Sequence, residues 1–113
     1  MKKAIIAITL AALSASAYAE QTYTPNQLNR MINSGQYPEQ GPVNNSQTES
    51  MSFSGCKDSV EKVMSQLRGA YPVKTIVNTG FLFSVKAWTN DGVITASCSK
   101  PDRKRVLTQA PYK

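Results

Sequence analysis

Residues 56–98 read CKDSVEKVMSQLRGAYPVKTIVNTGFLFSVKAWTNDGVITASC, and this stretch predicts the fold of the chain. It opens with apolar residues at spacings of 4, 3, 1 and 3, which are Cys56, Val60, Val63, Met64 and Leu67. Residues three and four apart lie on the same side of a helix, so these residues share one face. Ser54 is the expected N-cap, and Gly69 and Pro72 are expected to end the helix.

Three strands are expected after this helix, at residues 73–77, 81–88 and 93–99. The first is rich in β-branched residues, which favour strands. Turn sequences separate the strands: Asn78-Thr79-Gly80 comes first, and Asp91-Gly92, a strong hairpin signal, comes second. The pattern therefore predicts an antiparallel meander.

The second hairpin gathers apolar residues on one face of the sheet. If Asp91-Gly92 forms a two-residue turn, Val85 lies opposite Cys98, and one face carries Phe81, Phe83, Val85, Ala87, Ala96 and Cys98. Because Cys56 lies on the apolar helix face, we expect this sheet face to pack on the helix and the two cysteines to form a disulfide. Closing a loop of about forty residues contributes on the order of 4 kcal/mol.

The segments on either side complete the predicted fold. Residues 105–109 could add a fourth, edge strand with Leu107 roughly opposite Cys98, and residues 110–113 are expected to fray. The sequence thus predicts an α+β domain over residues 55–113, in which one amphipathic helix packs on a three- to four-stranded antiparallel β-meander closed by one disulfide.

Residues 20–54 are expected to form a flexible polar N-terminal arm. A short helix is predicted at residues 25–34, with Thr24 as N-cap, Pro25 in the first turn and Gly35 after the end. Residues 36–50, QYPEQGPVNNSQTES, contain two prolines, a glycine and almost no apolar side chain, so we expect a mobile linker.

Residues 1–19 have the pattern of a signal peptide. Two lysines precede an apolar run at residues 4–13, and Ala17-Tyr18-Ala19 matches the small-residue cleavage pattern. Cleavage after Ala19 would leave Glu20 at the N-terminus and no transmembrane segment. The style of this segment is bacterial, so we expect a periplasmic protein, with an extracellular location as the alternative.

The composition excludes several kinds of catalytic site. The chain has no histidine and two cysteines, so neither a Cys/His zinc site nor a Cys-His or Ser-His-Asp nucleophile can be assembled. The cysteines do not form a CxxC redox motif. Asp58 and Glu61 lie three apart beside lysines, which is typical of a solvated helix face. We therefore expect no enzyme activity, no catalytic residue, no metal and no cofactor.

Two groups of residues are candidate binding sites. The sheet face opposite the helix carries the partner-binding candidates, which are Leu82, Trp88, Ile76 and Lys86. A competing interpretation is that Met51, Phe53 or the short N-terminal helix folds over this face. The second group is a basic patch made of Lys100, Arg103, Lys104 and Arg105. It could meet a polyanion, or it could discourage aggregation at the sheet edge.

These features favour a small exported protein that acts as a non-enzymatic interaction or accessory module. The expected partner is a protein of the cell envelope, for instance in secretion, conjugation or pilus assembly. One alternative is a secreted toxin or enzyme inhibitor. Another is a polyanion or membrane-surface binder that makes peripheral membrane contact through the basic turn. Nucleic acid is not expected as a partner, because the chain is predicted to leave the cytoplasm.

Overall fold

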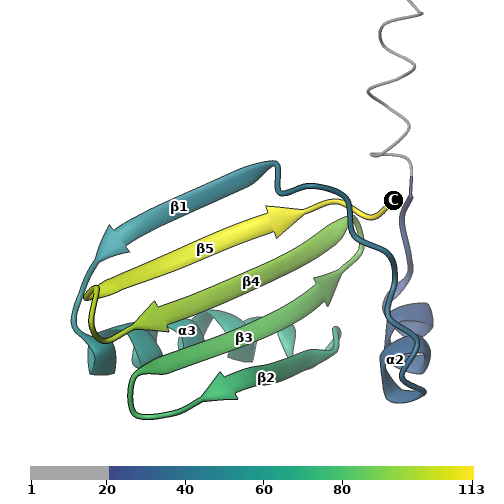
Figure 1. Cartoon of the computed structure of the whole chain (residues 1–113). Helices are drawn as coiled ribbons and strands as arrows, with labels where there is room; N and C mark the ends of the chain where they lie inside the picture. Colours follow the sequence, from purple (N-terminus) through teal and green to yellow (C-terminus); the bar gives the residue numbers. More distant parts are fainter. Residues whose placement is uncertain (1–20) are drawn as a thin grey trace, which may run out of the picture.

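The computed structural model describes residues 21–113 (Figure 1). The predicted signal peptide lies outside these described residues. The described elements are α2 (Pro25–Asn33), β1 (Asn45–Ser50), α3 (Phe53–Leu67), β2 (Val73–Asn78), β3 (Leu82–Thr89), β4 (Gly92–Ser99) and β5 (Lys104–Ala110). The strands form one antiparallel sheet in the order β1-β5-β4-β3-β2, and α3 lies across one face of it (Figure 1). The predicted α+β class is confirmed.

The helix α3 begins at Phe53, three residues before Cys56, the first residue of the predicted apolar stripe. Ser52, and not Ser54, is the N-cap, because its hydroxyl accepts a hydrogen bond from the Gly55 amide at 3.1 Å. Cys56, Val60 and Met64 are buried against the sheet, whereas Val63 at the margin of the apolar stripe is 38% exposed.

The main core lies between α3 and the sheet, as the sequence predicts. Its buried members are Cys56, Val60, Met64, Phe83, Val85, Ala87, Ala96 and Cys98. The disulfide between Cys56 and Cys98 is present, with both residues buried and their Cα atoms 5.8 Å apart. It ties the first turns of α3 to β4, the central strand of the sheet.

The β3–β4 hairpin has a different turn from the predicted one. Gly92 pairs with Thr89 inside the ladder, so the turn consists of Asn90 and Asp91, and Cys98 lies opposite Phe83 instead of Val85. This register differs by two residues, and since side chains alternate with a period of two, Phe83, Val85, Ala87, Ala96 and Cys98 stay on the predicted core face, whereas Phe81 does not join them. Gly92 allows β5 to approach closely, because a Cβ at this position would lie 2.6 Å from the carbonyl oxygen of Ala110.

Part of the predicted linker forms β1, which adds a fifth strand to the four that were predicted. β1 pairs with β5 from Asn45↔Gln109 to Ser50↔Lys104, so β5 is not an edge strand. All six β1 side chains are polar and exposed. With no apolar alternation, the sequence of β1 lacks the pattern by which a strand is predicted. In β5, Leu107 lies opposite Ala96 and not Cys98, and it packs on the main core.

A second, smaller core lies at the other end of the sheet, under α2. The capping box at Thr24, Pro25 in the first turn and Gly35 at a φ of 79° bear out the predicted ends of this helix. Its residues Leu28 and Ile32 pack with Trp88, Val93 and Tyr112. The C-terminus is not frayed, because Tyr112 is fully buried and forms bridges with Gln21 and Gln40.

Candidate interaction surface

The two faces of the sheet differ in what covers them. α3 lies on one face, and the opposite face is uncovered except at the α2 end (Figure 1). We call this uncovered part the open face. By the strand registers, it carries mostly hydroxyl and lysine side chains: Ser46, Thr48 and Ser50 of β1; Lys104, Val106 and Thr108 of β5; Thr95, Ser97 and Ser99 of β4; Leu82, Ser84 and Lys86 of β3; Lys74 and Val77 of β2.

Trp88 does not belong to the exposed part of this face. It is 3% exposed, because the apolar side of α2 covers it, and the Tyr37 ring lies 5.5 Å from the indole. Of the covering segments considered from the sequence, the short N-terminal helix is the one that covers Trp88, whereas Met51 and Phe53 pack on the main core. Trp88 is therefore unavailable to a partner while α2 is in place.

Polar contacts hold the α2 end closed. Tyr112 donates from its hydroxyl to the Thr89 carbonyl at 2.7 Å, and burial raises the pKa of this phenol, as do Tyr23 and Asp91 nearby. Asn90 donates from its side chain to the Tyr23 carbonyl at 2.8 Å and accepts from the Tyr71 hydroxyl. Residues from the N-terminal segment, the hairpin turn and the C-terminus are thus fastened together.

The other three partner-binding candidates remain accessible. Leu82 is 49% exposed and Ile76 is 52% exposed, and Ile76 occupies a bulge in the edge strand β2. Lys86 lies directly opposite Lys74 across the β2–β3 pair, and its other neighbour is Thr95. Like charges in directly opposite cross-strand positions repel each other. A carboxylate from a binding partner would reduce this repulsion, so the pair favours an acidic partner.

The open face has a uniform sign of charge. Within residues 21–113, the strands contain one carboxylate, that of Glu49, which the register places on the α3 side of the sheet. Lys74, Lys86 and Lys104 are therefore the ionisable side chains that the described strands place on the open face. Ser84 and Ser97 contact each other through their hydroxyls at 3.1 Å in the middle of it.

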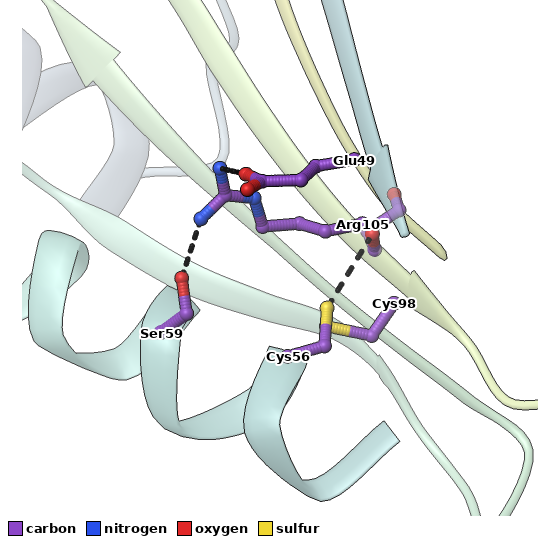
Figure 2. Close-up of polar contacts among 6 residues, drawn as sticks. Glu49, Cys56, Ser59, Cys98 and Arg105 are labelled. Atoms are coloured by element: carbon purple, nitrogen blue, oxygen red, sulfur yellow. Dashed lines mark hydrogen bonds and ion pairs between the residues drawn. A yellow bond between two sulfur atoms is a disulfide. The ribbon is translucent and has the colours of Figure 1, made fainter. Parts of the chain in front are cut away.

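The predicted basic patch is divided by the sheet. Arg105 points to the α3 side, where it forms an ion pair with Glu49 at 2.9 Å and donates to the Ser59 hydroxyl (Figure 2). Its side chain is 16% exposed, so Arg105 is a link between β5, β1 and α3 and not a free cation. Lys100, Arg103 and Lys104 are exposed, and none of them forms an ion pair within the described part of the chain.

These three basic residues share one end of the sheet with exposed apolar side chains. The β2–β3 turn, the β4–β5 turn and the start of α3 all lie at the end opposite α2 (Figure 1). The Lys100 amide donates to the Phe81 carbonyl at 2.9 Å, and the Met51 amide donates to the Arg103 carbonyl at 3.0 Å. We call this region the basic end, defined by Phe81, Leu82, Lys100, Arg103 and Lys104.

Sequence reasoning missed Phe81 as a surface residue. The expected central strand began at Phe81 and placed it in the core, but β3 begins at Leu82 and Phe81 is 65% exposed in the turn. The signal that could have located it is Thr79, whose hydroxyl accepts hydrogen bonds from the amides of Phe81 and Leu82. A side-chain bond of this kind is typical of a turn that continues past its glycine.

Within residues 21–113, no cluster of His, Cys, Asp or Glu could hold a metal ion, and no helix is long and apolar enough to cross a membrane. The chain matches no protein-family model, no curated protein and no solved structure. The candidate surfaces are therefore interpreted from their own chemistry.

Proposed function

We propose that this chain is a small exported, non-enzymatic binding module that holds an acidic protein partner of the cell envelope on its open face. The observation that carries this proposal is a sheet with α3 packed on one face and the other face open across its strands. A flat surface of this kind suits recognition of another protein more than conversion of a small substrate, which needs a closed pocket.

The chemistry of the open face supports a polar, acidic partner. Its serine and threonine hydroxyls can each donate and accept hydrogen bonds. Lys86 and Lys74 face each other with no carboxylate between them, and a carboxylate from a partner would relieve their repulsion. Leu82 and Ile76 add exposed apolar area at one side. Export is supported by the buried disulfide, since disulfides persist in oxidising compartments.

The proposal is tested by affinity capture from the native cell envelope with two matched variants. Lys86→Glu reverses a charge on the open face, and Lys62→Glu makes the same change on the exposed side of α3. We expect a partner that binds the wild type and Lys62→Glu but is lost with Lys86→Glu. Retention of that partner by both variants would place the binding site elsewhere.

The cellular location of the chain is measured on the same cells. Cell fractionation and intact mass should find a chain that begins at Glu20 in the periplasmic fraction. A chain found only in the culture medium, with no envelope partner, would support the toxin or inhibitor alternative instead. A cytoplasmic chain that retains residues 1–19 would contradict export.

A further inference from the structure

The basic end carries an apolar tip that the fold leaves uncovered. Phe81 and Leu82 form this tip, and their exposed fractions are 65% and 49%. Phe81 lies in the turn itself, beyond the end of the ladder. An exposed aromatic in a turn is not required for the core, which is complete without it.

Basic side chains lie on one side of this tip, in the β4–β5 turn and at the start of β5. The Lys100 amide donates to the Phe81 carbonyl, Arg103 follows in the same β4–β5 turn, and Lys104 is the first residue of β5. The carboxylate within this turn, Asp102, is engaged with the Ser99 hydroxyl at 2.9 Å. Arg103 adopts a φ of 51°, which is rare for a residue other than glycine, asparagine or aspartate. The turn therefore carries two cations that form no ion pair within the described residues, together with the Asp102 carboxylate, and Lys104 adds a third cation at the start of β5.

The same end has a hollow with two basic side chains in its lining. It has a volume of about 310 Å³ and is lined by Ser52, Phe53, Ser54, Lys100 and Arg103. Ser52 is the N-cap of α3, so the positive end of that helix dipole faces the hollow together with the two cations. This arrangement suits a phosphate-sized anion placed beside an apolar tip.

From this combination we infer that the basic end docks on the anionic surface of a phospholipid bilayer. Phe81 and Leu82 enter the headgroup region, and Lys100, Arg103 and Lys104 contact lipid phosphates beside them. Apolar side chains beside a group of cations match the layering of a bilayer, in which acyl chains lie beneath charged headgroups. A soluble polyanion would use the cations but would leave Phe81 in water.

Docking by the basic end would leave most of the open face accessible, although Leu82 and Lys104 belong to both surfaces. The strands run from the basic end toward α2, so the sheet would stand on the membrane by one end and its faces would point sideways (Figure 1). The inference does not depend on the proposed protein partner, because Phe81, Lys100 and Arg103 lie in turns outside the open face and Lys86 takes no part in it. A failure of either proposal leaves the other standing.

The test measures binding of the protein to phosphatidylcholine vesicles with and without phosphatidylglycerol. One variant removes the basic charges: Lys100→Gln, Arg103→Gln and Lys104→Gln. A matched control removes three exposed charges elsewhere: Arg30→Gln, Lys62→Gln and Arg68→Gln. All forms carry the same N-terminus, so the comparison reports on the basic end. Each basic residue near an anionic surface contributes roughly a factor of five, so the first variant should bind on the order of 100-fold more weakly.

A second variant reports whether the tip enters the bilayer. The chain has one tryptophan, Trp88, which is buried, so Phe81→Trp adds a single exposed reporter. With anionic vesicles, we expect a blue shift of its emission and quenching by brominated acyl chains, neither of which the wild type shows. Phe81→Ser should weaken vesicle binding while retaining its dependence on anionic lipid.

Four results would overturn the inference. These are equal binding to neutral and anionic vesicles, an equal loss of affinity in the matched control, no binding to either kind of vesicle, and binding to polyphosphate as tight as to vesicles without an emission shift at residue 81. The last result would identify a soluble polyanion site instead of a membrane contact. Affinity of the wild type should also fall with added salt, which needs no variant.

Discussion

Arg105 shows how a charged residue can stabilise a layer interface instead of a binding surface. Its guanidinium joins Glu49 of β1 and Ser59 of α3 beside the disulfide (Figure 2). The adjacent residue, Lys104, is exposed and extends from the other side of the sheet. Two neighbouring cations therefore have different roles. Their roles follow from the alternation of side chains between the two faces of β5 and not from their charge.

Replacing Arg105 tests this structural role. Arg105→Ala removes two charge-assisted hydrogen bonds and the packing of the side-chain stem, so it should lower the free energy of unfolding by about 1–2 kcal/mol. The loss is limited because Glu49 is 63% exposed and regains water. Urea denaturation measures it, with Lys104→Ala as the matched control, which should change stability by less than about 0.5 kcal/mol. Equal losses in both variants would contradict the link.

Tyr112 gives a prediction at alkaline pH. Its folded-state pKa is raised above the ordinary value of 10.0 by burial, so the folded state keeps the phenol proton that the unfolded state releases. Stability that depends on this group is therefore complete below about pH 10 and declines as pH rises above it. Thermal unfolding of the wild type should show this decline.

The decline should be smaller in Tyr112→Phe. That variant lacks the titrating hydroxyl, although it also loses the hydrogen bonds to the carbonyls of Thr89 and Gly92 and so should be less stable at neutral pH. Tyr37→Phe, which alters a 53% exposed tyrosine, serves as the control and should retain the wild-type pH dependence. An unchanged slope in Tyr112→Phe would exclude Tyr112 as the source.

Among the elements, those built on an apolar pattern could be predicted and those built on backbone pairing could not. α3 and β3 follow the periods of a helix and a strand, and their apolar faces meet as predicted. β1 has no apolar residue, and it forms because β5 offers an unpaired edge and Arg105 offers a partner for Glu49. No sequence period records an opportunity of that kind.

The candidate site was predictable to the same extent. Alternation places Leu82, Lys86 and Trp88 on one face of β3, and all three do point to that side. The burial of Trp88 depends on where α2 docks, which is decided by contacts across more than fifty residues, with Leu28 and Ile32. The basic end depends on two turns that lie together at one end of the sheet. Turn conformations are set by tertiary hydrogen bonds such as that from the Lys100 amide to the Phe81 carbonyl.

At the scale of the whole molecule, the sheet contributes residues to two separate cores. The main core under α3 contains the disulfide, and the smaller core under α2 contains no cysteine. β3 contributes Phe83, Val85 and Ala87 to the first core and Trp88 to the second. Such small cores provide limited apolar burial, so the cross-link between α3 and β4 is expected to supply a large share of the net stability.

Opening the disulfide tests that dependence. The covalent loop spans a sequence separation of 42 residues. A loop of that size stabilises the folded state by about 4 kcal/mol through the entropy of the unfolded chain. Reductant should therefore lower the urea midpoint of the wild type strongly and make the chain sensitive to protease. The double variant Cys56→Ala/Cys98→Ala should begin near that lowered midpoint and show no response to reductant, because it lacks the disulfide that reductant opens in the wild type. Free thiols in the exported protein, or a wild-type midpoint that reductant leaves unchanged, would show that the two layers hold together without the bond.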